Sequence, residues 1–176
     1  MREKVSSAII DKAVDLWCKK LMDPVFDNGD KSDHGFLSMA LATINIETAK
    51  TKIQNMAERI EVFKTALRDE LLRVRDNPKD GEYFSPWLDV DYHPCQLLAD
   101  AAEKAGIPKS QFSCKSSVAM FSDCVQVSFG YAATHIYYYP LPDGRWLITS
   151  LRGKDITKII DSVISLGNPL NFLVEG

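Results

Sequence analysis

The 176-residue sequence has few cysteines, no surplus of basic residues and no long apolar run, and each absence excludes a class of protein. Four cysteines are too few for a disulfide scaffold in a chain of this length, so we expect a reducing, cytoplasmic setting. No stretch reaches the 18 apolar residues of a membrane-spanning helix, and the first residues lack the apolar core of a signal peptide, so we expect no membrane partner. The net charge of −3 argues against nucleic acid as a partner, because no basic surplus is available to neutralise phosphates.

Proline and glycine are scarce in the first 77 residues, which contain only Pro24, Gly29 and Gly35. Seven of the eight prolines and seven of the nine glycines follow residue 77, so the two parts of the chain differ in structure. The junction 76–86 contains Asn-Pro and Asp-Gly, which both break regular structure. This composition predicts a helical oligomerisation region over residues 1–77 and a compact α+β domain over residues 82–176.

The first part of the chain predicts a hairpin of two helices, over residues 3–22 and 34–75. Apolar residues of the second helix recur every seven positions, a step that favours a left-handed coiled contact. Forty helical residues would extend about 60 Å, longer than a domain of this size is wide. We therefore expect the second helix to drive self-association through an interface of five residues: Ile46, Ile53, Ile60, Phe63 and Leu67.

The second part predicts a helix, a sheet and a final helix. The first helix begins at His93 or Pro94 and ends at Ala105, where Gly106 stops it. Four strands follow, over residues 115–122, 124–131, 134–139 and 145–151, and a helix covers residues 155–166. Short links between successive strands favour an antiparallel sheet with helices on one face. The fold class is therefore α+β, with a four-stranded antiparallel sheet.

The segment Leu88–Cys95 holds the densest group of ligating side chains. In an extended chain Asp89, Asp91 and His93 point to one side and could ligate a divalent metal. The simpler interpretation is that Asp91 or His93 caps the following helix and Asp89 is solvated. Zinc would need His93 together with Cys95, Cys114 and Cys124, but the close cysteine pairs of structural zinc sites are missing. The prediction is no metal and no cofactor.

A second group of candidate residues suits an anionic ligand. Tyr92 and His93 lie at the start of the predicted helix 93–105, whose free N–H groups and dipole favour anions. In the strand 134–139, His135, Tyr137 and Tyr139 share one face, and such aromatic side chains are favoured at binding surfaces. The alternative is that this row belongs to the core. As ligand contacts we predict Tyr92, His93, His135, Tyr137 and Tyr139.

Two segments give the chain a resemblance to known proteins. They are FDNGDKSDHGFLSMAL, which precedes the long charged helix, and VDYHPCQLLADAAEKAGIP, which precedes a short sheet. In this arrangement the chain resembles small accessory proteins encoded by bacteriophages. The resemblance implies a protein made in the cytoplasm of an infected bacterium, often one that binds and blocks a host factor. It implies no catalytic residues.

These observations predict a non-enzymatic binding protein, an accessory or inhibitor protein that forms homo-oligomers through its long helix. It would bind a host protein or sequester a small anionic ligand. The alternative is a small metal-assisted hydrolase that uses Asp89, Asp91 and His93. Basic residues of the long helix alternate with glutamates, so that face is expected to be solvated and nucleic acid is not an expected partner.

Self-association predicts the mass of the purified protein in solution. Light scattering and native mass spectrometry should give a clean multiple of 19.8 kDa, because the long helix would bury its apolar row against a second copy. A mass near 19.8 kDa would instead show that the helix folds back within a single chain.

Overall fold

The computed structural model describes residues 4–22, 46–112, 115–130, 133–152, 155–166 and 173–175, without the side chains of residues 46–54 and 155. The described elements, in chain order, are α1 (Ser7–Met22), α3 (Ile46–Asp76), β1 (Trp87–Val90), α4 (Gln96–Ala105), a short 3-10 helix (Lys109–Gln111), β2 (Ser116–Met120), β3 (Val125–Ser128), β4 (Ile136–Pro140), β5 (Trp146–Thr149), α5 (Asp155–Leu166) and β6 (Leu173–Glu175). The fold is α+β, as the sequence predicts. The link between the two predicted N-terminal helices and residues 34–45 of the second helix lie outside the described residues.

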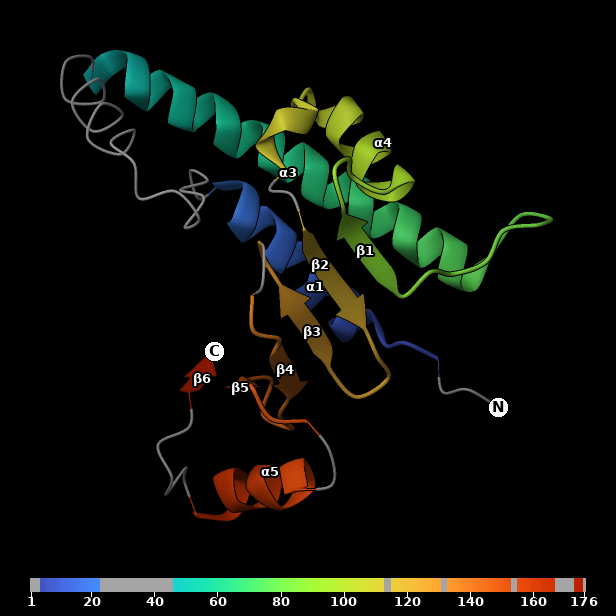
Figure 1. Cartoon of the computed structure of the whole chain (residues 1–176), viewed down its shortest axis with the longest axis vertical. Coiled ribbons are helices and arrows are strands. Elements are labelled where there is room, and N and C mark those ends of the chain that lie inside the picture. Colours follow the sequence, from blue (N-terminus) through green and yellow to red (C-terminus); the bar gives the residue numbers. More distant parts are fainter. Residues whose placement is uncertain are drawn as a thin grey trace.

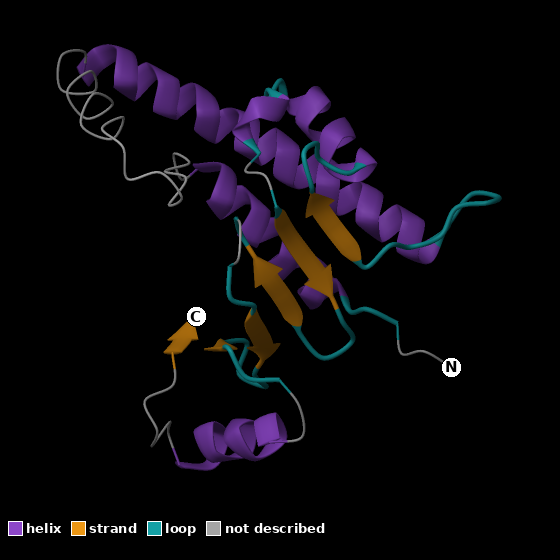
Figure 2. Cartoon of the chain, viewed as in Figure 1, coloured by secondary structure: helices purple, strands orange, loops and turns teal. Residues whose placement is uncertain are grey.

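The described strands form one antiparallel sheet in the order β1-β2-β3-β4-β5-β6 (Figure 2). The predicted four-stranded sheet is therefore wrong, because an additional strand pairs at each edge. The pairing of β1 with β2 depends on residues almost 30 positions later, so it could not be predicted from the β1 segment itself. The second additional strand, β6, has three residues, too few to show a periodic pattern.

Helix α1 packs against α3 on one side and against β2 and β3 on another (Figure 1). Its buried residues include Ile9, Ile10, Ala13, Val14, Leu16 and Trp17. They belong to one hydrophobic cluster that also takes in residues of α3, α4 and the first three strands. The N-terminal helices are thus not a separate hairpin, because the core continues across the predicted boundary between residues 77 and 82.

Helix α3 contributes the residues that the heptad pattern assigned to an oligomer interface. Phe63 and Leu67 are fully buried and Ile60 is 5% exposed, all within the core of one chain. The heptad pattern assigned these three residues to an interface with a second copy, whereas the structure packs them inside one chain, where α3 contacts α1 and α4. The side chains of Ile46 and Ile53 lie outside the described part, so self-association stays a prediction. No described helix, α3 included, is long and apolar enough to cross a membrane.

The start of α4 differs from the prediction. The helix begins at Gln96 with Cys95 as the preceding cap residue, and no side chain caps its first turn. Pro94 instead forms an isolated antiparallel bridge with Val90, and the chain bends over residues 91–93 before the helix begins. The end agrees with the sequence: Gly106 has a φ of 65°, and its left-handed conformation terminates the helix.

The two faces of the sheet carry different clusters. Successive residues of a strand point to opposite faces, so Tyr138 lies on the α1 side while Tyr137 and Tyr139 lie on the other. Tyr137 and Tyr139 share a smaller cluster with Ile156 and Val163 of α5. Helices therefore cover both faces, α1 on one and α5 on the other, and not one face as the sequence predicts.

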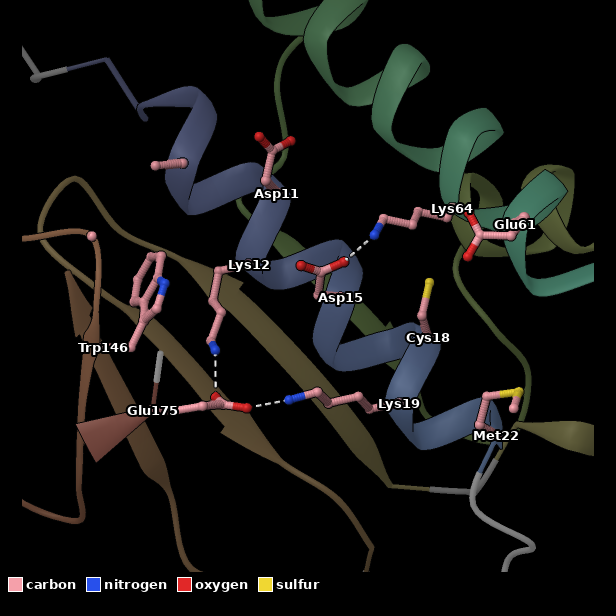
Figure 3. A pocket seen from close by; sticks show the side chains of 12 residues that line it. Asp11, Lys12, Asp15, Cys18, Lys19, Met22, Glu61, Lys64, Trp146 and Glu175 are labelled. Carbon is pink, nitrogen blue, oxygen red and sulfur yellow. Dashed lines mark hydrogen bonds and ion pairs between the residues drawn. The ribbon is translucent and has the colours of Figure 1, made fainter. Parts of the chain in front are cut away.

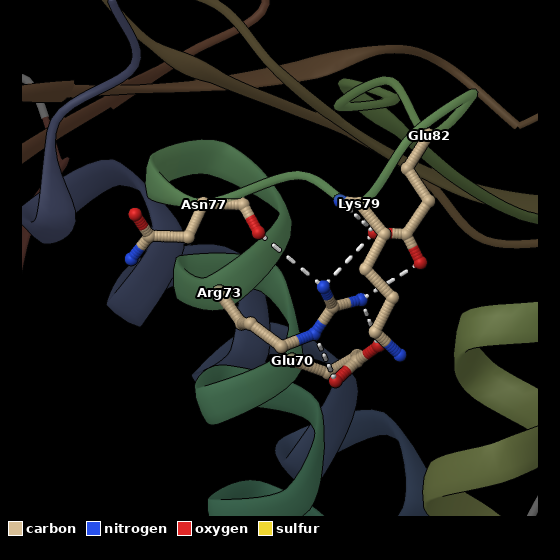
Figure 4. Close-up of polar contacts among 5 residues, drawn as sticks. All are labelled: Glu70, Arg73, Asn77, Lys79 and Glu82. Atoms are coloured by element: carbon tan, nitrogen blue, oxygen red, sulfur yellow. Dashed lines mark hydrogen bonds and ion pairs between the residues drawn. The ribbon is translucent and has the colours of Figure 1, made fainter.

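Arg73 ties the end of α3 to the link that follows it (Figure 4). Its guanidinium donates to the carboxylates of Glu70 at 2.7 Å and Glu82 at 2.9 Å, and to the backbone carbonyl of Asn77 at 3.5 Å. The backbone N–H of Lys79 also donates to Glu82, at 2.8 Å. Arg73, with this N–H, lowers the pKa of Glu82 to about 2. The segment predicted as a boundary between domains is thus fixed to α3.

The burial of Leu67 predicts a loss of stability on truncation. Leu67→Ala should lower the free energy of unfolding by about 2–5 kcal/mol in urea denaturation, because it leaves a cavity between packed elements. Val62→Ala is the matched control on the same helix, since Val62 is 48% exposed and should change stability by about 0.5 kcal/mol or less. Equal effects of the two substitutions would contradict the observed packing of α3.

Candidate functional site

The ligand contacts that the sequence predicts do not form one site. Tyr92 and His93 are exposed in the link between β1 and α4, and His135 is exposed just before β4. Strands β1 and β4 are separated by β2 and β3, which corresponds to about 14 Å across the sheet. Tyr92 is 66% exposed, and the ammonium of Lys115 lies 4.5 Å from its ring centroid. These three residues are therefore surface residues of two separate regions.

The other two predicted contacts are core residues. Tyr137 is 8% exposed and Tyr139 is 2% exposed, in the cluster that α5 covers. The hydroxyl of Tyr139 donates to the backbone carbonyl of Leu151 at 3.5 Å, and burial raises the pKa of this phenol. Of the two interpretations of the strand 134–139, the structure supports the one in which these tyrosines pack inside.

The row proposed for metal binding is also exposed. Asp91 forms an ion pair with Lys115, and the carbonyl of Asp89 accepts a hydrogen bond from the N–H of Cys95 at 2.9 Å. Among the described residues, no three His, Cys, Asp or Glu side chains lie close enough to hold a metal ion. Cys114 lies outside the described residues. The metal-assisted hydrolase thus has no supporting observation in the described part of the chain.

The described cysteines are not activated as nucleophiles. Cys18 and Cys124 are buried, and burial is the main cause that raises the pKa of each thiol to about 12. Burial raises the pKa of Cys95 as well. At neutral pH these three side chains are thiols, whereas the reactive form is the thiolate.

A groove of about 830 Å³ runs along α1, between α3 on one side and the strands β5 and β6 on the other (Figure 3). Helices α1 and α3 form one part of its wall, and Trp146 of β5 and Glu175 of β6 form another. Its charged lining consists of Asp11, Lys12, Asp15, Lys19, Glu61, Lys64 and Glu175. None of the predicted contact residues belongs to it.

Lys12 is the most buried charged residue of this groove, with 8% of its surface exposed. It lies three residues after Ile9 and four before Leu16, so the helix places it at the margin of its buried face. Its ammonium lies 4.9 Å from the ring centroid of Tyr138 and 5.2 Å from that of Trp146. The contact with two aromatic faces favours a cation that has lost most of its water.

Lys12 and Lys19 converge on a single carboxylate, that of Glu175 (Figure 3). The two lysines are seven residues apart, which is two helical turns, so they project from the same side of α1. The ammonium of Lys12 donates to Glu175 Oε2 at 2.6 Å, and that of Lys19 donates to Oε1. These bonds lower the pKa of Glu175 and raise that of Lys19.

The acids of α1 have other partners. Asp11 accepts a hydrogen bond from Arg68 at 2.6 Å, and Asp15 pairs with Lys64 at 2.8 Å, so both acids face the cations of α3. The charges of α1 are thus separated by side: its acids face α3, and its two groove lysines face the sheet (Figure 3). This separation leaves a site with two ammonium groups, two aromatic rings and one acid.

The sequence contains one signal for this site, which is a lysine within the apolar pattern of the first helix. Lys12 lies between positions that are buried on both sides of it, and a lysine there is rarely buried without a partner. The sequence gives no such signal for Glu175 and Trp146. These two residues come together only when β6 pairs with β5, and that pairing cannot be recognised from either segment alone.

No protein-family model matches the sequence, and no curated protein matches it significantly.

The lowered pKa of Glu175 predicts how its ion pairs respond to acid. Their contribution to folding is complete above pH 4.5, the ordinary value, and is lost as the pH falls through the lowered pKa. Glu175→Gln should therefore cost about 1–2 kcal/mol at pH 7, with the cost shrinking below pH 4.5. Urea denaturation at several pH values measures both quantities.

Glu58→Gln is the control for general effects of charge, since Glu58 is exposed on α3. A difference between wild type and Glu175→Gln that stays constant from pH 7 to pH 3 would contradict the ion pairs.

Proposed function

We propose that this chain is a non-enzymatic binding protein that holds an acidic group of its partner between Lys12 and Lys19. The observation that carries the proposal is the convergence of these two ammonium groups on one carboxylate in an open groove. The site differs from the one that the sequence predicts, whereas the class of ligand, an anion, is the same.

The chemistry of the site favours a carboxylate. Each ammonium offers three donors and no acceptor, so two of them can saturate both oxygens of one carboxylate. Lys12 is held between the rings of Tyr138 and Trp146, where an ammonium without an anion would be costly. Both lysines project from a helix that is itself packed in the core, so the backbone positions from which they project are fixed before a ligand arrives.

The state of the other groups in the groove favours binding without turnover. Asp11 and Asp15 are engaged in ion pairs with α3, and neither is left as a general base. The raised pKa of Cys18 keeps it as a thiol. The two lysines that converge on Glu175 therefore favour the positioning of an acidic group.

The resemblance to bacteriophage accessory proteins supports a host protein as the bearer of the acidic group. The chain would then act in the host cytoplasm as an inhibitor or accessory factor. The alternative is that the same two lysines bind a small anionic ligand and sequester it. Assembly into homo-oligomers through the N-terminal half of α3 remains part of the proposal.

Restoring the missing carboxylate tests this function. Glu175→Ala should lower the melting temperature, and acetate, which replaces the deleted carboxymethyl group, should raise it again by binding to the two lysines. At about ten times its Kd, acetate would add about 1.4 kcal/mol of stability. Acetamide, the neutral analogue, should have no effect.

Two controls make the acetate experiment specific. The double variant Lys12→Met with Glu175→Ala should not respond to acetate, because one ammonium is gone. Wild type should respond less than Glu175→Ala, because its own carboxylate fills the site. An equal rise in all three proteins at matched ionic strength would refute the proposal.

A further inference from the structure

We infer that the partner supplies its acidic group on an extended segment that pairs with β5 in the place of β6. This inference rests on the proposed function of the groove and names the class of partner: a peptide strand, not a free anion. In this arrangement β6, with Glu175, occupies the site in the absence of the partner.

Strand β6 is a weakly held edge of the sheet. It has three residues, Leu173–Glu175, and pairs with β5 alone. Leu173 is 66% exposed, so this residue adds little apolar burial. Within the described part of the chain, the contacts of the strand are its backbone pairing, the packing of Val174 and the two ion pairs of Glu175. These contacts are the ones that a replacement strand would have to reproduce.

The register of β6 defines the sequence that a replacement would need. Leu173, Val174 and Glu175 lie opposite Ile148, Leu147 and Trp146, and the two strands are antiparallel. Val174 packs on the cluster of the α5 side, whereas Glu175 points to α1. A matching peptide would run antiparallel to β5 and carry an apolar residue followed directly by glutamate.

The charges beside β5 select an acidic strand over a neutral one. Lys12 and Lys19 have ion pairs with Glu175, whereas Asp11 and Asp15 are paired with α3. A strand that displaced β6 without an acid would leave the buried ammonium of Lys12 between two aromatic rings with no anion. The backbone edge gives general affinity for extended peptides, and the lysine pair gives selectivity.

The geometry brings these two elements of recognition together. Trp146 belongs to β5, lines the groove and contacts Lys12, so the edge of the sheet and the cation site share one residue (Figure 3). The groove extends beyond Glu175 along α1 towards Cys18 and Met22. Side chains of a longer partner would have space there.

Peptide exchange on the full chain tests the inference. The receptor is the Glu175→Gln variant, whose β6 keeps its shape but lacks the charge. The probe is a fluorescein-labelled peptide, Leu-Asn-Phe-Leu-Val-Glu-Gly, which copies residues 170–176. Fluorescence anisotropy should show saturable binding, and the same peptide with glutamine for glutamate should bind at least about tenfold more weakly.

The matched protein variants are made in the Glu175→Gln background. Lys12→Met and Lys19→Met should each weaken the acidic peptide at least about tenfold and leave the glutamine peptide almost unchanged. Lys20→Met is the control, because Lys20 lies over the ring of Phe129 and not in the groove. Wild type should bind the acidic peptide more weakly than Glu175→Gln, since its own strand competes.

The outcomes separate this inference from the proposed function. If acetate stabilises Glu175→Ala while the acidic and glutamine peptides bind equally or not at all, the groove binds anions but does not exchange a strand, and the inference is overturned. If acetate also fails, both proposals fall.

Discussion

The burial of α1 is the constraint on which the rest of the structure depends. Its apolar residues are covered by α3 on one side and by β2 and β3 on another. The ring centroid of Trp17 lies 5.8 Å from that of Phe112 and 5.4 Å from that of Phe129. A helix packed on two sides has a single strip left for polar residues. Lys12 and Lys19 occupy that strip towards the sheet, and Asp11 and Asp15 occupy it towards α3. The groove is therefore a consequence of how the core is assembled.

The same constraint links stability to binding. Lys12 is nearly buried among core residues, so its ammonium needs an anion in the folded chain, and Glu175 on a three-residue edge strand provides it. In the proposed exchange, a partner strand would have to bring a carboxylate to the edge of β5 in place of Glu175. The retention of β6 in the free chain and the selectivity for an acidic strand would then depend on the same pair of lysines.

Elements with a long or regular pattern could be predicted from the sequence, and short or paired ones could not. The helix over residues 155–166 has the predicted ends, and Gly106 ends α4 as expected from its conformational freedom. The heptad row of α3 identified Ile60, Phe63 and Leu67 as apolar contacts but not their partner. A repeated apolar row indicates that one face of the helix is covered, but it does not indicate whether the same chain or another chain covers that face. The strand 134–139 shows the same ambiguity, since alternation does not tell which row is inside.

The sequence by itself determined the α+β class, the positions of the main helices and strands, and the presence of a lysine within the apolar pattern of α1. Local spacing and helix-ending residues are properties of neighbouring positions, so they can be read along the chain. Only the tertiary structure decided that β1 and β6 extend the sheet, that α5 covers the second face, and that Lys12 meets Glu175 from 163 positions away. Such a contact depends on the register of β5 and β6 and on the docking of α1, and neither is encoded in any local stretch of sequence.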